Sequence, residues 1–178
     1  MKRAFPIFRL LFLLICSLCS IISCSSSTGI DDFYTINLGK AGSFSVSPQV
    51  ILHQDVSVPF QIIIDSADLI TSPTLQTSFA NIKSAELTKL TFSSIASFPM
   101  TNFDTLRLIA SNDSLTDLTL ATYIGAQDSV YLTHADFGAY LKKPSSHYSI
   151  IYNAIKAPTQ AVNISASYTV TLTAAPLQ

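Results

Sequence analysis

The stretch that decides the fold lies near the C-terminus and reads VNISASYTVTLT, from Val162 to Thr173. Every second residue is apolar, and the residues between them carry amide or hydroxyl side chains. Side chains of a β-strand alternate between its two faces, so this period of two predicts a strand with one face in a core and one in water. The water-facing side of this strand carries hydroxyls where most proteins carry charges.

The same alternation recurs along residues 33–178. It is clear from Val56 to Ile64 and shorter elsewhere, and turn-forming residues separate the apolar segments. We count seven to nine strands, and short strands at this spacing are typical of a sandwich or barrel. The sequence therefore predicts an all-β fold, an immunoglobulin-like antiparallel β-sandwich that forms one domain over 33–178.

Three local features add detail to this prediction. Residues 33–38 and 44–50 are expected to form two early strands, with a turn at 39–42, where the sequence reads GKAG. In the segment around Leu87 and Leu90 the apolar phase shifts by one residue. A shift of phase within one strand predicts a β-bulge.

One short helix is expected near 134–142. Thr133 offers a cap, and Asp136 follows three residues later. Phe137 and Tyr140 are three residues apart, which places them on one face of a helix. We expect this helix to cover one end of the sandwich through its apolar face.

The N-terminal segment 1–23 differs in composition from the rest of the chain. Met1-Lys2-Arg3 is basic, and the apolar run from Leu10 to Ile22 contains no charge. A basic start followed by a short apolar run is typical of a secretory signal peptide. A single-pass membrane anchor is the alternative, but a span needs about 20 apolar residues, which is more than this run supplies.

All three cysteines, Cys16, Cys19 and Cys24, lie at or before position 24. The segment 33–178 therefore contains no disulfide framework and no thiolate metal site. Ile21-Ile22-Ser23-Cys24 resembles the bacterial lipobox, in which a small residue precedes the modified cysteine. This resemblance implies that Cys24 is lipidated. The alternative is that Cys24 is an unmodified residue of an ordinary signal peptide.

The lipobox divides the chain into a lipoprotein signal peptide at 1–23, a lipidated tether at 24–32 and the sandwich domain at 33–178. Residue Ser25 is not aspartate, so by analogy with enteric bacteria the destination is the outer membrane. No acidic run follows Cys24 directly, since Asp31 is the first acidic residue after it. A lipid anchor facing the periplasm is therefore favoured over one at the cell surface.

Charged residues make up only 12% of the chain. From Cys24 onward the chain holds seven Lys and Arg and eleven Asp and Glu, a net charge of 7 − 11 = −4. Nucleic-acid binders present basic surfaces to phosphates, so this charge excludes a nucleic-acid partner. The expected partners are the membrane, through the lipid anchor, and an envelope protein or glycan.

The sequence contains no recognisable catalytic motif. His53, His134 and His147 are far apart and none has metal-ligand spacing. No nucleophile elbow, phosphate loop or dinucleotide fingerprint is present. We expect a protein that is not an enzyme and needs no metal or cofactor, and an envelope enzyme remains the least favoured alternative.

Two patterns bear on glycans. Tyr123 and Tyr131 are expected on the face opposite the core, where they form either a binding strip for sugars or a cover for the sheet. Four segments fit D-[ST]-[aliphatic or Thr], which resembles the O-glycosylation pattern of Bacteroidota, although Asp-Ser also starts turns. The candidate acceptors are Ser66, Thr105, Ser114 and Ser129.

A family resemblance follows from the order of several segments. They read AELTKLTF at 85–92, FDTLRLIA at 103–110, DFGAYLK at 136–142 and YTVTLTAAPL at 168–177. This order resembles a group of small Bacteroidota lipoproteins, and its first parts are similar to LEA14-like water-stress domains. The resemblance covers Ser84 to the C-terminus, implies an immunoglobulin-like sandwich, and transfers no site residue.

These observations lead to one expected function. The chain is interpreted as a lipid-anchored lipoprotein of the bacterial cell envelope with a non-catalytic binding or structural accessory role. The alternative is a glycan- or lipid-binding protein of the outer membrane, which uses the hydroxyl-rich face or one end of the sandwich.

Overall fold

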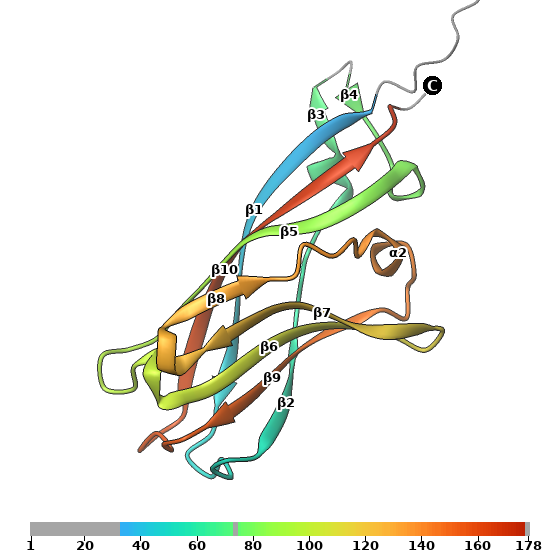
Figure 1. Cartoon of the computed structure of the whole chain (residues 1–178). Helices are drawn as coiled ribbons and strands as arrows, with labels where there is room; N and C mark the ends of the chain where they lie inside the picture. Colours follow the sequence, from blue (N-terminus) through green and yellow to red (C-terminus); the bar gives the residue numbers. More distant parts are fainter. Residues whose placement is uncertain (1–32, 73–74, 177–178) are drawn as a thin grey trace, which may run out of the picture. The chain divides into compact units, whose positions relative to one another are not determined.

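The computed structural model describes residues 33–72 and 75–176, and they form an antiparallel β-sandwich with one short helix (Figure 1). The predicted signal peptide, the tether and Cys24 lie outside the described residues. One sheet has three strands in the order β1-β10-β5, namely β1 (Tyr34–Val46), β10 (Val162–Ala174) and β5 (Ile82–Ser93).

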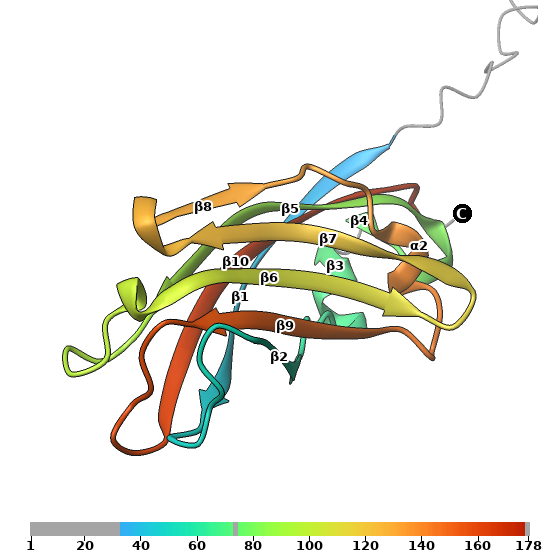
Figure 2. The ribbon, with the colours of Figure 1, turned by 60° about the horizontal axis from the view of Figure 1, so that its bottom comes forward.

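The second sheet has five strands in the order β2-β9-β6-β7-β8 (Figure 2). Its members are β2 (Asp55–Phe60), β9 (His147–Ala154), β6 (Phe103–Asn112), β7 (Leu115–Ile124) and β8 (Ser129–Leu132). The short elements are η1 (Ser66–Leu69), β3 (Ile70–Ser72), β4 (Leu75–Gln76), η2 (Phe79–Asn81), η3 (Met100–Asn102), η4 (Gly125–Gln127) and α2 (Gly138–Leu141). The predicted all-β sandwich of seven to nine strands is confirmed, with eight strands in the two sheets.

Strand β10 is the centre of the three-stranded sheet, as its long alternation indicates. Its apolar residues are buried, whereas Asn163, Ser165 and Ser167 on the opposite face are exposed. It pairs with β1 through thirteen consecutive residue pairs, from Tyr34 with Ala174 to Val46 with Val162. The hydroxyl-bearing face of β10 is therefore the outer face of this sheet.

The predicted turn at 39–42 is wrong. Residues 34–46 form one continuous strand, and neither glycine in it has a positive φ. Gly42 faces inward, where a Cβ would lie 2.8 Å from the ring of Phe60, so close packing explains this glycine and a turn does not. Pairing with β10 along its whole length keeps β1 straight through the GKAG segment.

The predicted bulge in β5 is confirmed. Lys89 pairs with Thr169 and Leu87 pairs with Val170, so Thr88 is the extra residue. The bulge allows both Leu87 and Leu90 to face the core, where both are buried.

The core lies between the inner faces of the two sheets. Phe103, with no exposed surface, packs edge-on against Phe98 at 5.5 Å and Tyr152 at 5.6 Å between ring centroids. From the other sheet, Phe44 stacks on Tyr152 at 6.0 Å. Burying such a side chain contributes about 1.5–3 kcal/mol, so the aromatic contacts join the two sheets.

The predicted helix exists but is shorter than 134–142. His134 has a left-handed φ of 53°, and α2 begins only at Gly138. Thr133 does not cap the helix, because its hydroxyl donates to the Thr119 carbonyl at 2.8 Å. The Thr133 N–H bonds to the Leu120 carbonyl of β7, and residues 136 and 137 bond to Ala85 at the edge of β5 before α2 begins.

Candidate functional site

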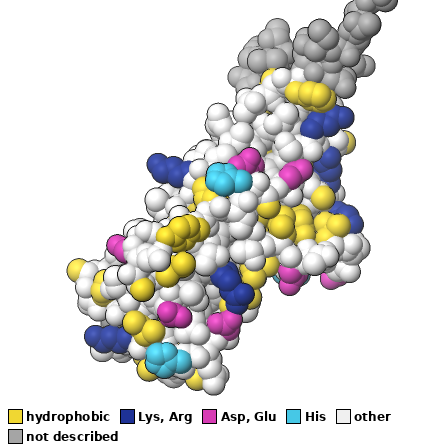
Figure 3. Space-filling view, in the orientation of Figure 1, with side chains coloured by type: hydrophobic (Ala, Val, Ile, Leu, Met, Phe, Trp, Pro, Cys, Tyr) yellow, Lys and Arg dark blue, Asp and Glu magenta, His cyan; other side chains and the backbone are white. Residues whose placement is uncertain are grey.

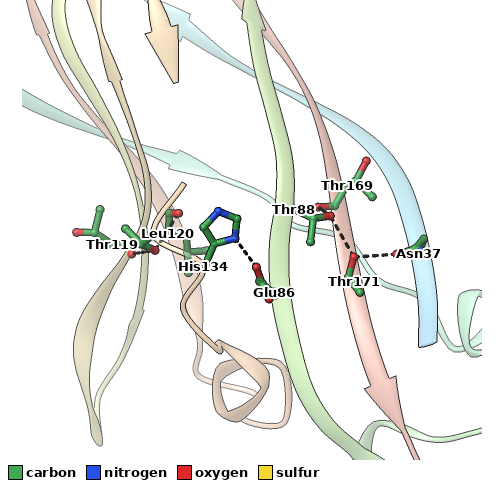
Figure 4. A network of polar contacts seen from close by, with 9 residues as sticks. Asn37, Glu86, Thr88, Thr119, Leu120, His134, Thr169 and Thr171 are labelled. Carbon is green, nitrogen blue, oxygen red and sulfur yellow. Dashed lines mark hydrogen bonds and ion pairs between the residues drawn. The ribbon is translucent and has the colours of Figure 1, made fainter. Parts of the chain in front are cut away.

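The outer face of the three-stranded sheet carries a row of polar side chains across all three strands (Figure 4). The hydroxyl groups of Thr88 in β5 and Thr171 in β10 lie 3.0 Å apart, and Thr171 donates to Asn37 Oδ1 in β1 at 2.8 Å. Thr88 is the bulge residue, so the bulge brings its hydroxyl into the row. This face offers many hydrogen-bonding groups and little charge.

A shallow hollow lies farther along the same face. Its volume is about 350 Å³, and it forms where the small residues of β1 leave space beside the hydroxyls of β10. Lys89 and Thr91 of β5 border it on the far side. The lining residues are Gly39, Lys40, Ala41, Lys89, Thr91, Ser167, Tyr168 and Thr169. Its lining combines the hydroxyl groups of Thr91, Ser167 and Thr169 with apolar surface.

The His134 imidazole contacts the Glu86 carboxylate beside β5, and the two form an ion pair when the imidazole is protonated (Figure 4). The distance from Nδ1 to Oε1 is 2.5 Å, and the two side chains are 65% and 40% exposed. At this exposure water competes strongly for both groups. Figure 3 shows acidic and basic side chains scattered over this face of the molecule, and they form no continuous charged patch.

A second ion pair is more buried and lies on the inner side of β1. Lys40 Nζ lies 2.6 Å from Asp68 Oδ2, and the side chains are only 23% and 20% exposed. The hydrogen bond with Asp68 is the main cause that raises the pKa of Lys40, and the same bond lowers the pKa of Asp68. The backbone N–H of Asp65 also donates to Asp68, at 2.7 Å, and adds to that lowering.

Tyr168 lies opposite Lys40 in the β1–β10 ladder and completes this inner cluster. Its hydroxyl donates to the Gln61 carbonyl and accepts from the Ile63 N–H, both at 3.2 Å. Burial of the ring raises the pKa of Tyr168. The cluster holds residues 61–69 against β1. Its role is therefore structural, because it closes the open side of the sandwich between β1 and β2.

Two grooves flank the segment after β2. One, of about 520 Å³, is lined by residues 59–64 and 146–148, and the other, of about 350 Å³, lies between residues 41–43 and 59–63. Ile63, 46% exposed, borders both. The Tyr148 hydroxyl is buried and has no hydrogen-bond partner among the described residues, and burial strongly raises the pKa of Tyr148.

The loops at the end of the sandwich opposite Tyr34 present aliphatic side chains to solvent. The loops at 47–54 and 155–161 adjoin, because the His53 N–H donates to the Ala154 carbonyl at 2.9 Å. The exposed residues at this end are Ile51, Leu52, Ile95 and Ile155. This end offers apolar contacts, unlike the hydroxyl-rich sheet face.

The predicted position on the face opposite the core is wrong for Tyr123 and right for Tyr131. Tyr123 is buried in the core against Phe92, and its hydroxyl donates to Asp128 at 2.8 Å. Tyr131 is 50% exposed, and its hydroxyl donates to Gln127. The pairs Leu108–Ala121 and Ile109–Thr119 show an irregularity near Leu120, which reverses the faces of the following residues.

Two of the candidate glycosylation residues are exposed. Ser66 is the first residue of η1, where Asp65 is the N-cap. Ser114 lies in the β6–β7 turn, where its hydroxyl donates to Asn112 Oδ1 at 2.8 Å and accepts from Lys143 Nζ at 2.6 Å. Both motifs therefore occupy positions where Asp-Ser also has a local structural role.

The other two candidates are half-buried. Thr105 lies in β6 between Ile124 and Asn153 of the neighbouring strands. Ser129 begins β8, and its hydroxyl donates to the Gln127 carbonyl at 2.9 Å. The structure does not bring the four candidates together, and Cys24 lies outside the described residues.

Sequence reasoning missed the inner cluster, although one signal was present. Lys40 is in phase with the inward residues Ile36, Leu38 and Phe44 of the same strand. A charged residue in phase with buried residues predicts an inward partner of opposite charge. Asp68, 28 residues away, is that partner.

The fold and these surfaces define an all-β sandwich with a polar sheet face, two open grooves and an apolar loop end. Comparisons with protein-family models, curated proteins and solved structures found no match to this chain. Within residues 33–72 and 75–176, no helix is long and apolar enough to cross a membrane. In the same part of the chain, no group of three or more His, Cys, Asp or Glu side chains is placed to hold a metal ion.

Proposed function

We propose that this chain is a lipid-anchored lipoprotein of the bacterial cell envelope that serves as a non-catalytic binding or structural accessory module. The observation that carries the proposal is the lipobox-like Ile21-Ile22-Ser23-Cys24, together with the confinement of all cysteines to the segment that ends at Cys24. Acyl chains on Cys24 attach the protein to a bilayer, because each buried CH₂ contributes about 0.8 kcal/mol. The outer membrane, facing the periplasm, is the proposed location.

The distance from the anchor to the domain supports this reading. Strand β1 begins at Tyr34, which is 34 − 24 = 10 residues after Cys24. Ten residues reach at most about 35 Å, so the tether keeps the sandwich close to the bilayer. An accessory module held at a membrane surface meets partners there at high effective concentration.

The character of the polar clusters supports a non-catalytic role. Lys40, Asp68 and Tyr168 bond to one another or to backbone groups that close the sandwich. The raised pKa of Tyr123 arises first from burial in the core. These interactions all have a packing role, so the proposal assigns binding to the surfaces of the sandwich.

A second candidate function is glycan binding on the hydroxyl-rich sheet face. The hollow of about 350 Å³ favours it, because Thr91, Ser167 and Lys89 supply hydrogen-bond donors around a space left by small residues. The aromatic side chain at this hollow, Tyr168, packs its ring inward against Phe60. Recognition there would therefore rest on hydrogen bonds more than on stacking.

The anchor is tested by metabolic labelling with radioactive palmitate in a bacterial host. We expect label on the wild-type protein and its loss, together with release from the membrane fraction, in Cys24→Ala. Cys16→Ala and Cys19→Ala are matched controls that keep the label. Equal labelling of Cys24→Ala and wild type would refute the anchor.

The intact mass of protein purified from its native membrane also tests the proposed modifications. Acylation at Cys24 and glycosylation at Ser66, Thr105, Ser114 or Ser129 each add a defined mass to the polypeptide. A mass that equals polypeptide plus lipid alone removes the glycosylation proposal and leaves the anchor in place.

A further inference from the structure

The four edge strands of the two sheets are protected to different degrees. Strand β8 has only four residues, and β2 has six with Pro59 among them. In β5, the backbone of Ala85 is bonded to residues 136 and 137, and the bulge at Thr88 interrupts the edge. Short length, proline, bulges and covering segments are the means by which proteins block edge-to-edge pairing. Strand β1 has thirteen residues, no proline and no bulge.

The hydrogen bonds of Ala85 fix which backbone groups of β1 face outward. Ala85 directs its N–H to Asp136 Oδ1 and its C=O to the Phe137 N–H, both at 2.8 Å and both away from β10. In an antiparallel ladder, its partner Leu172 then directs its own groups to the other neighbour, which is Ile36 of β1. By alternation, the residues of β1 that face the open edge are Thr35, Asn37, Gly39, Ala41, Ser43 and Ser45.

These six residues present six N–H and six C=O groups at the open edge of β1. Within residues 33–72 and 75–176, no backbone hydrogen bond from another segment reaches them. Residues 61–69 are held on the inner side of this sheet, where Asp68 contacts Lys40 of β1 and the Ile63 N–H donates to the Tyr168 hydroxyl of β10. The backbone edge therefore stays unpaired in the described part of the chain.

Two small hollows adjoin this edge. The groove of about 350 Å³ beside residues 41–43 opens on one side of it, and the hollow at Gly39 to Ala41 opens on the other. The outward side chains are small and uncharged, and a Cβ on Gly39 would meet no atom within 4 Å. An incoming strand would lie about 4.8 Å from β1.

We propose that β1 is a self-association edge, through which two copies of this chain pair antiparallel and form one six-stranded sheet. Self-pairing places each edge residue opposite another of the same set. The set is Thr, Asn, Gly, Ala, Ser and Ser, so no like charges meet. The one charge in β1, on Lys40, points inward to Asp68.

The symmetry of this contact determines the size of the assembly. An antiparallel pair of identical strands has a two-fold axis, so each copy uses the same surface and the contact closes at two copies. The other described edges are short, interrupted or covered, and they do not extend the sheet. The pairing uses only β1 and goes beyond the proposed anchor, so it does not depend on the modification at Cys24.

The oligomeric state of the full chain, extracted from membranes in mild detergent, is measured by sedimentation velocity. Protein concentrations from about 1 to about 100 µM cover micromolar dissociation constants. We expect a concentration-dependent dimer, and Cys24→Ala should dimerise equally. Ala41→Glu and Ala41→Lys should each weaken the dimer about ten-fold or more, because like charges then meet across the two-fold axis. A mixture of the two variants should restore it.

Ser167→Glu is the matched control. Ser167 is the direct partner of Ala41 on the same outer face, but it lies in the central strand β10 and should leave the dimer unchanged. Thermal unfolding checks that every variant is folded. A wild-type chain that stays monomeric throughout, a dimer that survives both Ala41 substitutions, or a mixture that remains monomeric would each overturn the proposal. Loss of palmitate labelling without loss of the dimer would bear only on the anchor.

Discussion

The two open sides of the sandwich are closed in different ways. On the side of β5 and β8, residues 136 and 137 bond directly to the backbone of Ala85 in the edge strand β5. The Phe137 N–H donates to the Ala85 carbonyl, and Asp136 Oδ1 accepts from the Ala85 N–H. On the side of β1 and β2, residues 61–69 are held by side chains, with Asp68 on Lys40 and Tyr168 on the backbone at 61 and 63.

This difference has two consequences. The bonds from residues 136 and 137 occupy part of the backbone edge of β5, whereas the contacts of residues 61–69 leave the backbone edge of β1 unpaired in the described residues. The accompanying ion pairs also differ, since Lys40 and Asp68 are about one-fifth exposed, whereas His134 and Glu86 are 65% and 40% exposed. On the β5 side, the bonds from Asp136 and Phe137 to Ala85 do not involve the His134–Glu86 pair, whereas on the β1 side the Lys40–Asp68 ion pair is itself one of the contacts that hold residues 61–69.

The largest effect is expected for Asp136→Ala. One carboxylate oxygen accepts from the N–H groups of Ala85 and Gly138, at 2.8 and 2.9 Å, and both of these residues are buried. Leaving buried donors unpaired costs about 1–3 kcal/mol, and we expect a loss of about 2 kcal/mol in the free energy of unfolding. Urea unfolding followed by circular dichroism measures it.

Asp136→Asn is the control, because its amide keeps one acceptor oxygen for the same two donors. It should retain most of the stability that Asp136→Ala loses. If both variants unfold at the same urea concentration as the wild type, the closure of the β5 side does not rest on this carboxylate.

The second effect is a pH dependence on the β1 side. The pKa of Asp68 is lowered in the folded state, so its pairing with Lys40 contributes stability above the unfolded pKa of a carboxyl, near 4. That contribution disappears as the pH falls through the folded pKa. At pH 7 we expect Asp68→Asn to have a lower free energy of unfolding than the wild type, with a loss smaller than that of Asp136→Ala. At strongly acidic pH, Asp68→Asn and the wild type should be equally stable.

Urea unfolding of both proteins from about pH 2.5 to pH 7 tests this, a range that brackets the carboxyl titration. The nearby Asp65 also acts on Lys40, so Asp65→Asn serves as the control for a long-range charge effect. A stability difference between Asp68→Asn and wild type that stays constant down to the lowest pH would contradict the assigned role of the ion pair.

The sequence predicted correctly those parts of the fold that depend only on the alternation of apolar and polar residues along a strand. Burial in β10 follows the alternation from Val162, and the bulge at Thr88 follows the phase shift between Leu87 and Leu90. In these segments the apolar residues lie on one face only, so the sequence contains enough information to assign the faces.

The sequence predictions that are wrong concern segments whose local structure depends on a partner far away in the sequence. Leu118, Leu120, Ala121 and Tyr123 are all apolar, so their faces depend on where β7 bulges against β6. Asp136 looks like a helix residue, but its partner is the backbone of Ala85, 51 residues away. The GKAG turn signal at 39–42 is overridden by thirteen pairs with β10.

The smallest effect is expected for Glu86→Gln, which removes the charge of the pair with His134. Exposed ion pairs contribute about 0–1 kcal/mol, and at 65% and 40% exposure we expect a loss under about 0.5 kcal/mol that vanishes in molar salt. A double-mutant cycle with His134→Ala measures the coupling. Because the bonds from Asp136 and Phe137 to Ala85 do not involve this pair, a coupling as large as the effect of Asp136→Ala would mean that an exposed ion pair also holds the β5 side, and the contrast between the two sides would fail.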